Sequence, residues 1–186
     1  LQRATGAELI GRVADHPAGQ DGSFTPDRVP DDGERLDFGG GCTLRAIHTP
    51  GHASNHLCYL LDEEKTLFTG DHVMQLSTVV INPPDGDMGA YLRSLRELME
   101  LELEWLAPGH GFLMPQPRKA MQQIVDHRLK RETKVLQAFA PGGAMAVDEL
   151  LASVYDDVPP KLHAMARRSL QAHLLKLRDD GRIAEE

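Results

Sequence analysis

The sequence has few cysteines and lacks any apolar run long enough to cross a membrane. No apolar stretch approaches the roughly 20 residues that a membrane-spanning helix needs, and no segment resembles a secretory signal peptide. The two cysteines, Cys42 and Cys58, are too few for a disulfide framework, and we interpret them as free thiols on strands. These features favour a cytoplasmic protein in a reducing compartment that has no membrane partner.

The common nucleophile motifs are missing as well. The sequence contains no Gly-x-Ser-x-Gly elbow, and neither cysteine has a visible activating base. A hydrolase that works through a covalent serine or cysteine intermediate is therefore not indicated. The chain also opens with LQRATGAELIG and without a methionine, which is typical of the middle of a domain.

Charge divides the 186 residues into two parts. Residues 1–118 carry 9 basic and 18 acidic side chains, whereas residues 119–186 carry 11 basic and 10 acidic side chains. So uneven a distribution indicates two units of different character. We predict one domain over residues 1–118 and a second, helical domain over residues 119–186.

The two parts also differ in their predicted secondary structure. Short apolar runs separated by turn sequences predict β-strands up to about residue 80. Beyond that point the apolar residues recur at helical spacing, and Asp87 is the expected N-cap of the first helix. Further helices are predicted at about 118–139, 147–155 and 162–178. The sequence DDGRI then predicts a turn into a short β-wing, which makes the tail similar to a winged-helix module.

Three short motifs place histidine or aspartate beside glycine at predicted strand ends. They are HTPGHASNH (residues 48–56), FTGDH (68–72) and APGHG (107–111). Glycine allows a sharp backbone turn and the close approach of another group. Imidazole and carboxylate groups are ligands that zinc and similar divalent ions accept. A carboxylate can also bridge two metal ions, which would give Asp71 a role distinct from its neighbours.

In this order the motifs resemble the last three metal motifs of the metallo-β-lactamase superfamily. The stretch after Gly70 and the helical tail look like its β-lactamase-like protein 2 branch, some members of which are metal-dependent endoribonucleases. The resemblance implies an α+β fold, namely the C-terminal part of an αββα sandwich followed by an all-α, winged-helix-like module. It implies that His52, Asp71 and His110 are metal ligands, with Asp71 as the catalytic residue that bridges two metals.

The same resemblance leaves the role of two further histidines open. His56 and His72 would orient a metal ligand or contact the substrate. Simple structural hydrogen bonding is an equally good interpretation for both. His48 is interpreted as structural. We assign no function to the remaining histidines, which are His16, His127, His163 and His173.

One motif of the family is absent. Its first metal motif, His-x-His-x-Asp-His, does not occur in the sequence. Together with the missing methionine, this predicts that the chain is the C-terminal part of a longer protein and lacks half of the metal site. We therefore expect weak metal binding, and self-association through an apolar face that the missing half would cover.

The resemblance implies a metal-dependent hydrolase. Hydroxide held between two Zn²⁺ ions, or between Mn²⁺ or Fe²⁺ ions, would attack a small ester, thioester or lactam, or single-stranded RNA. The alternative is a nucleic-acid-binding winged-helix protein with a remnant metal domain. A basic cluster on the last predicted helix bears on this alternative, but nearby acidic residues dilute it. The cluster comprises Arg167, Arg168, His173, Lys176 and Arg178.

Overall fold

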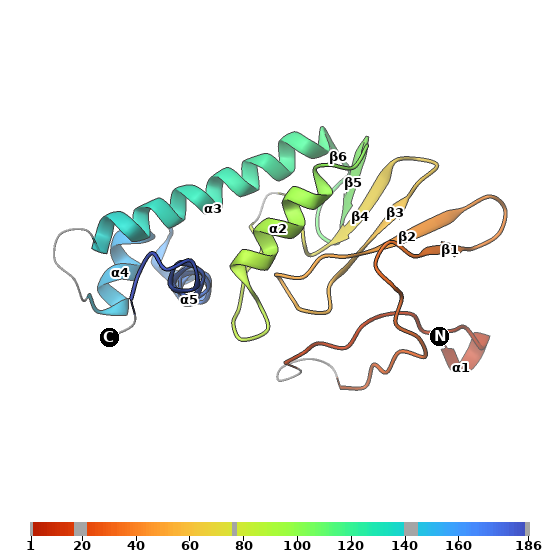
Figure 1. Ribbon diagram of the computed structural model, residues 1–186, viewed down its shortest axis with the longest axis horizontal. Helices are drawn as coiled ribbons and strands as arrows, with labels where there is room; N and C mark the ends of the chain where they lie inside the picture. Colours follow the sequence, from red (N-terminus) through yellow and green to blue (C-terminus); the bar gives the residue numbers. More distant parts are fainter. Residues whose placement is uncertain (1, 17–21, 76–77, 140–144, 185–186) are drawn as a thin grey trace.

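The computed structural model describes residues 2–16, 22–75, 78–139 and 145–184, and its strands form one six-stranded sheet in the order β1-β2-β3-β4-β5-β6 (Figure 1). Neighbouring strands are antiparallel except for β4 and β5, which are parallel. A helix, α2, connects these two, as a parallel crossover requires. The strands are β1 (Arg35–Asp37), β2 (Thr43–His48), β3 (Leu57–Leu61), β4 (Thr66–Gly70), β5 (Trp105–Pro108) and β6 (Met114–Pro115).

The helices of the described residues follow the predicted periodicity closely. The Asp87 carboxylate accepts a hydrogen bond from the backbone N–H of Ala90 at 2.7 Å, so the predicted N-cap is confirmed. None of these helices is both long and apolar enough to cross a membrane. They are α1 (Gln2–Thr5), α2 (Met88–Leu98), α3 (Pro117–Phe139), α4 (Val147–Val154), the 3₁₀ turn η1 (Pro160–Leu162) and α5 (His163–Asp179).

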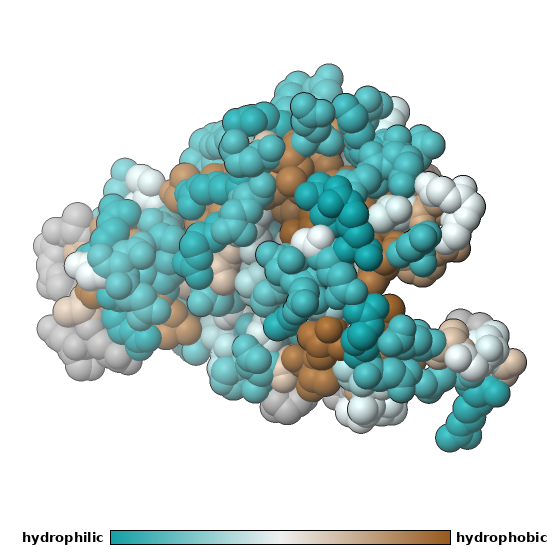
Figure 2. All heavy atoms as spheres, turned by 45° about the vertical axis from the view of Figure 1, so that its right-hand side comes forward, coloured by the Kyte–Doolittle hydropathy of each residue, from teal (hydrophilic) through white to brown (hydrophobic). Residues whose placement is uncertain are grey.

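The two faces of the sheet have different surroundings. Leu60, Leu67 and Leu106 are paired across β3, β4 and β5, and all three are buried in the core shared with α2 and the start of α3. Side chains alternate along a strand, so Phe68 and Trp105 lie on the opposite face, where they are 44% and 40% exposed. Apolar patches interrupt the hydrophilic surface of the sheet half in the view of Figure 2.

Helix α3 connects this core with a second one. It runs from the sheet to the C-terminal helices (Figure 1), and Val135 near its end packs with Leu150 of α4 and Leu170 of α5. The predicted boundary between residues 118 and 119 falls in the first turn of α3, and its exact place stays a prediction.

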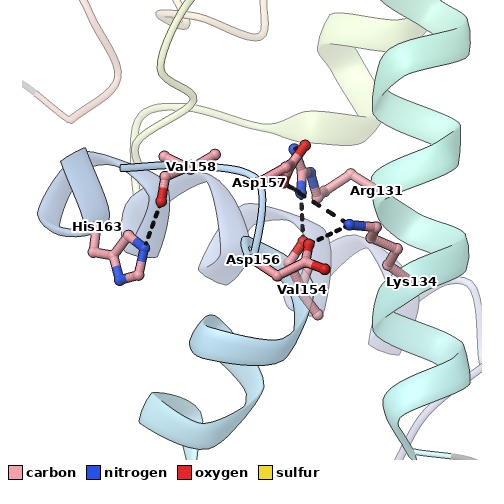
Figure 3. Close-up of polar contacts among 7 residues, drawn as sticks. All are labelled: Arg131, Lys134, Val154, Asp156, Asp157, Val158 and His163. Atoms are coloured by element: carbon pink, nitrogen blue, oxygen red, sulfur yellow. Dashed lines mark hydrogen bonds and ion pairs between the residues drawn. The ribbon is translucent and has the colours of Figure 1, made fainter. Parts of the chain in front are cut away.

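Arg131 joins α3 to the segment after α4 (Figure 3). Its buried guanidinium donates to the carbonyl oxygen of Val154 and to both carboxylate oxygens of Asp157, the latter at 2.7 and 3.1 Å. It also lies over the Tyr155 ring, 4.3 Å from the centroid. The hydrogen bonds from Arg131 lower the pKa of Asp157 to about 2. A short loop is thus fixed onto α3 by charge as well as by apolar packing.

Two sequence predictions need correction. No strand follows α5 in the described residues; Asp180 and Gly181 form a turn, so the predicted β-wing is not formed as far as residue 184. Both cysteines are free thiols as expected, but Cys42 lies directly before β2 and only Cys58 is on a strand.

Candidate metal centre

The three motifs converge at the side of the sheet where β4 and β5 end, which we call the candidate metal edge. Strands β4 and β5 are parallel, so the residues that follow Gly70 and Pro108 emerge side by side. Strand β3 is antiparallel to β4, which brings the loop of residues 49–56, just before β3, to the same edge. Topology alone therefore gathers segments that are far apart in the sequence.

Asp71 and His110 are brought together at this edge. Nε2 of His110 lies 3.5 Å from Oδ1 of Asp71, and both side chains reach solvent. The N–H of Gly109 donates to the carbonyl oxygen of Gly70 at 2.8 Å and holds the two loops together. A Cβ atom on Gly109 would lie only 3.2 Å from Oδ1 of Asp71 and from the carbonyl of Gly70. A side chain at this position would therefore require the Asp71 carboxylate or the Gly70 backbone to shift by a few tenths of an ångström.

The His52 ring has a defined orientation. Its Nδ1 lies 2.9 Å from the carbonyl oxygen of Val80, and because a carbonyl only accepts, Nδ1 carries the proton. The lone pair of Nε2 is therefore available to a ligand.

Helix α2 braces the loop that carries His52. Ser94 donates to the carbonyl oxygen of Pro50 at 2.8 Å. Gly51 has φ +139°, and a Cβ atom there would lie 2.3 Å from Cα of Tyr91. The loop can therefore pack this tightly on the helix only with glycine at this position.

His56 packs against the turn at Gly70, directly before Asp71. Its Nδ1 lies 2.8 Å from Oγ1 of Thr49, and its Nε2 packs against Gly70 so closely that a Cβ there would be 2.9 Å away. Burial and the nearby imidazole of His52 lower the pKa of His56 to about 4, so the ring is neutral at pH 7. This position suits orientation of the turn that presents Asp71.

His72 is enclosed in the core. Its ring lies between those of His56 and Tyr91, at centroid distances of 5.5 and 4.8 Å. Among the described residues neither ring nitrogen has a hydrogen-bond partner, and burial lowers its pKa far below the ordinary value. The Tyr91 hydroxyl donates to the His72 carbonyl oxygen at 2.9 Å. Enclosure favours a supporting role over contact with substrate.

The donor chemistry at this edge fits a divalent metal, but the number of ligands is small. Carboxylate oxygen and imidazole nitrogen are suitable donors, and Asp71 and His110 are already adjacent. In the part of the chain that the structure describes, no three His, Cys, Asp or Glu side chains are grouped closely enough to hold a metal ion. The described residues thus supply part of a site, and the individual ligand roles stay predictions.

The basic cluster on α5 is largely neutralised by acidic partners. Arg167 pairs with Asp148, and Arg178 pairs with Asp179 at 3.0 Å. Lys176 pairs with Glu132 at 2.9 Å and with Asp180 at 2.6 Å.

The histidines to which we assigned no catalytic role differ in their surroundings. His173 is buried, whereas Nε2 of His163 bonds the carbonyl oxygen of Val158 at 3.0 Å. Nε2 of His48 lies 2.8 Å from the carbonyl oxygen of Ser54, in keeping with a structural interpretation.

Sequence reasoning missed two buried arginines, Arg128 and Arg131. A signal was available for the first, because Met121, Val125, Arg128 and Val135 recur at helical spacing and all are buried. An arginine on the apolar face of a helix indicates a buried guanidinium with a specific task.

The chain matches two families. The match to the metallo-beta-lactamase superfamily spans residues 1–110, and the match to the beta-lactamase associated winged helix domain spans residues 146–186. The chain belongs to the metallo-β-lactamase superfamily. The resemblance and the α+β fold class predicted from the sequence are thus confirmed.

Curated relatives of this metallo-β-lactamase chain are longer than the chain itself. The atrochrysone carboxyl ACP thioesterase of Aspergillus chevalieri is 36% identical over 154 residues, which are 78% of this chain and 49% of the relative. The beta-lactamase-like protein 2 homolog of Drosophila melanogaster is 30% identical over 145 residues, 77% of this chain and 48% of the relative. The chain spans about half the length of these relatives.

Solved structures support the same fold. A metallo-beta-lactamase family protein from Thermus thermophilus superposes with a TM-score of 0.72 at 26% identity, over 85% of this chain and 50% of that one. A second protein, TTHA1623, solved in a di-iron-bound form, gives 0.53 at 26% identity, over 64% of this chain and 65% of that one.

Proposed function

We propose that the metallo-β-lactamase chain is part of a metal-dependent hydrolase that acts on small thioesters or esters. The observation that carries this proposal is the 3.5 Å approach of Asp71 to His110, two exposed metal-type donors from adjacent parallel strands. The relative from Aspergillus chevalieri that is named as a thioesterase supports hydrolysis as the reaction. The lack of a serine or cysteine nucleophile motif is in keeping with it.

Three residues would hold the metal. Nε2 of His52 has its lone pair free, because Nδ1 donates to Val80. The Asp71 carboxylate has two oxygens and would bridge two ions, and His110 would bind the second. We propose Zn²⁺, with Mn²⁺ or Fe²⁺ as alternatives, and the di-iron form of TTHA1623 gives iron some weight. A divalent metal supplies Lewis-acid activation of water and of the scissile carbonyl.

The remaining residues at the candidate metal edge hold the three metal ligands in position. His56 packs under Gly70 and keeps the turn before Asp71 in place. Thr49 fixes the His56 ring through Nδ1. Gly109 allows His110 to come within reach of Asp71. Each of these residues orients a donor atom, which is the usual task of groups directly behind a metal site.

A small-molecule substrate is favoured over single-stranded RNA. An RNA backbone needs exposed cations that are free to contact phosphates. On α5 three of the basic side chains, Arg167, Lys176 and Arg178, are engaged by carboxylates. This pairing also weakens the alternative of a nucleic-acid-binding module with a remnant metal domain.

The proposal is tested on the natural full-length protein and on this chain in parallel. Metal content by elemental analysis and hydrolysis of an N-acetylcysteamine thioester would be measured for both. We expect about two metal ions per full-length chain, in line with a dinuclear centre, little metal on the shorter chain, and thioester hydrolysis only with the former.

Two variants sharpen the result. In the full-length protein Asp71→Asn should lower both the metal affinity and the hydrolytic activity. Each should fall by more than the roughly 10–100-fold that is typical when a residue behind the metal ligands is changed. Asp37→Asn, on the distant edge strand β1, is the matched control and should change neither. Full activity of Asp71→Asn, or of metal-free protein, would contradict the proposal.

A further inference from the structure

A cavity of about 220 Å³ lies between α3, α5 and the segment of residues 78–80. Most of its lining is apolar and includes Val79, Val80 and Met165. Its basic groups come from α3, which contributes His127, Arg128 and Arg131. Among the described residues that line it there is no carboxylate. The cavity is therefore an apolar space with a positive wall.

The two arginines of this wall differ in their partners. Arg131 is neutralised by the bidentate contact with Asp157, as Figure 3 shows. Arg128 is 4% exposed, donates to the carbonyl oxygen of Val79 and lies 5.6 Å from the centroid of the Tyr91 ring. In the described part of the chain it has no salt-bridge partner. A buried cation without a counter-ion is costly, and an anionic ligand would compensate it.

Two buried polar atoms of residues that line the cavity have no hydrogen-bond partner among the described residues. They are Nε of Arg128 and the hydroxyl oxygen of Tyr155. Buried polar groups without a partner are rare in folded proteins, and an ordered water or a bound ligand would satisfy them.

Two structural links connect the lining of the cavity with the candidate metal edge. The carbonyl oxygen of Val80, which lines it, orients His52. A second cavity of about 470 Å³ shares Thr78 and His127 with the first, and its wall includes Met74 and Met114, which follow closely on Asp71 and His110 in the chain. Because they share these two residues, the two cavities adjoin one another beside α3.

We infer that the cavity beside α3 binds the acyl part of an ester or thioester whose far end carries a carboxylate, with Arg128 as the anchor of that carboxylate. The inference rests on the proposed function, because it places the acyl carbonyl toward the metal edge. The substrate class is thus an apolar acyl chain or ring that bears a distal anionic group. A polynucleotide does not fit, because a buried guanidinium in a cavity of this size is out of reach of a phosphodiester backbone.

The test uses binding alone, so that it does not depend on hydrolysis. Hexanoate, and the neutral hexanamide as its control, would be titrated into the chain in the presence of a chelator. Backbone NMR signals of Val79, Val80 and Ala166 report on the cavity. We expect saturable shifts with hexanoate, and binding of hexanamide about tenfold or more weaker, because it lacks the charge-assisted hydrogen bonds.

Two variants distinguish the contribution of the Arg128 charge to binding from that of the cavity volume. Arg128→Met should weaken the binding of hexanoate about tenfold or more and leave the binding of hexanamide unchanged. Arg168→Met removes an exposed arginine of the same tail that does not line the cavity, and should have no effect. Because Arg128 also supports a backbone carbonyl and its loss could impair folding, Met165→Trp is the second variant. It fills the cavity from a partly exposed position and should abolish binding of both probes.

The outcomes are distinct from those of the proposed function. Equal binding of hexanoate and hexanamide, shifts confined to other parts of the chain, or no effect of both Arg128→Met and Met165→Trp would overturn the inference. Failure of the full-length protein to bind metal would overturn the proposed hydrolase and leave the anion site measurable. Hydrolysis of neutral esters with no preference for carboxylate-bearing ones would overturn only the assignment of the acyl group.

Discussion

Nδ1 of His52 lies 2.9 Å from the carbonyl oxygen of Val80, and this contact ties the candidate metal ligand to the wall of the cavity beside α3. The neighbouring carbonyl oxygen, that of Val79, accepts from Arg128. Two consecutive backbone carbonyl groups therefore have separate tasks. That of Val80 orients His52, and that of Val79 accepts a hydrogen bond from the buried Arg128. A group bound at Arg128 and a metal bound at His52 would act on the same segment.

The first prediction concerns the glycine between the two metal loops. Gly109→Ala places a methyl group 3.2 Å from Oδ1 of Asp71 and should push that carboxylate away from His110. In the full-length protein we expect metal affinity to fall by about 10–100-fold, as for other groups that orient ligands. Isothermal titration with Zn²⁺ measures this.

Gly22→Ala is the control, because a Cβ atom there meets open space. Thermal unfolding should change little in both variants. Unaltered metal affinity in Gly109→Ala would show that the Asp71–His110 approach is unimportant.

The second prediction concerns acid stability. Arg131 lowers the pKa of Asp157 from the ordinary 3.8 to about 2, so the folded state favours the carboxylate. This contribution to stability is complete above about pH 4 and is lost as the pH falls toward 2. Asp157→Asn should therefore destabilise the protein at pH 7 and reduce the pH dependence of unfolding between pH 4 and 2.

The expected size of this effect is moderate. Removing one partner of a fully buried pair costs about 3–5 kcal/mol. The Asp157 side chain is 57% exposed, so screening by water reduces this to about 1–2 kcal/mol at pH 7. Urea unfolding at pH 7 and at pH 3 measures both quantities. Asp156→Asn, which breaks only the exposed pair with Lys134, should have a smaller effect.

The third prediction concerns self-association of this chain. Phe68 and Trp105 are partly exposed and lie on the sheet face opposite the core shared with α2 and α3. Exposed apolar faces of this kind mark contact surfaces. We expect the chain to associate, and Phe68→Asp or Trp105→Asp to weaken association roughly tenfold or more, since each buried aromatic contributes about 1.5–3 kcal/mol.

Sedimentation velocity over a range of protein concentrations measures the association. Phe112→Asp is the control, because this more exposed residue lies in the loop after β5 and not on the sheet. A monomer at all concentrations would contradict the proposed contact surface.

The fourth prediction concerns nucleic acid. Because Arg167, Lys176 and Arg178 are paired with carboxylates, binding of single-stranded RNA should be weak and only slightly salt-dependent. Between about 50 and 200 mM salt we expect a loss of roughly tenfold or less, whereas a protein that neutralises 6–10 phosphates loses about 10³–10⁵. Fluorescence anisotropy with a labelled oligonucleotide measures the slope, and a steep slope would restore RNA as the substrate.

The sequence predicted local structure well where local signals decide it. The N-cap at Asp87 and the helix that begins at Pro117 follow from short-range periodicity and capping chemistry. The turn before the predicted β-wing is present at Asp180 and Gly181, but residues 182–184 form no strand, because a turn is a local signal whereas a strand needs a partner. Signals within a few residues cannot report whether that partner is present.

The sequence by itself determined which residues carry metal-type chemistry, because Gly-His and Gly-Asp pairs at predicted strand ends are visible without any coordinates. Only the tertiary structure decided that Asp71 meets His110, since the parallel pairing of β4 and β5 aligns the ends of two distant strands. It also decided that Arg167, Lys176 and Arg178 of α5 are paired with acidic side chains and that Arg128 is buried. These properties depend on neighbours that are remote in the chain, and packing is what brings them together.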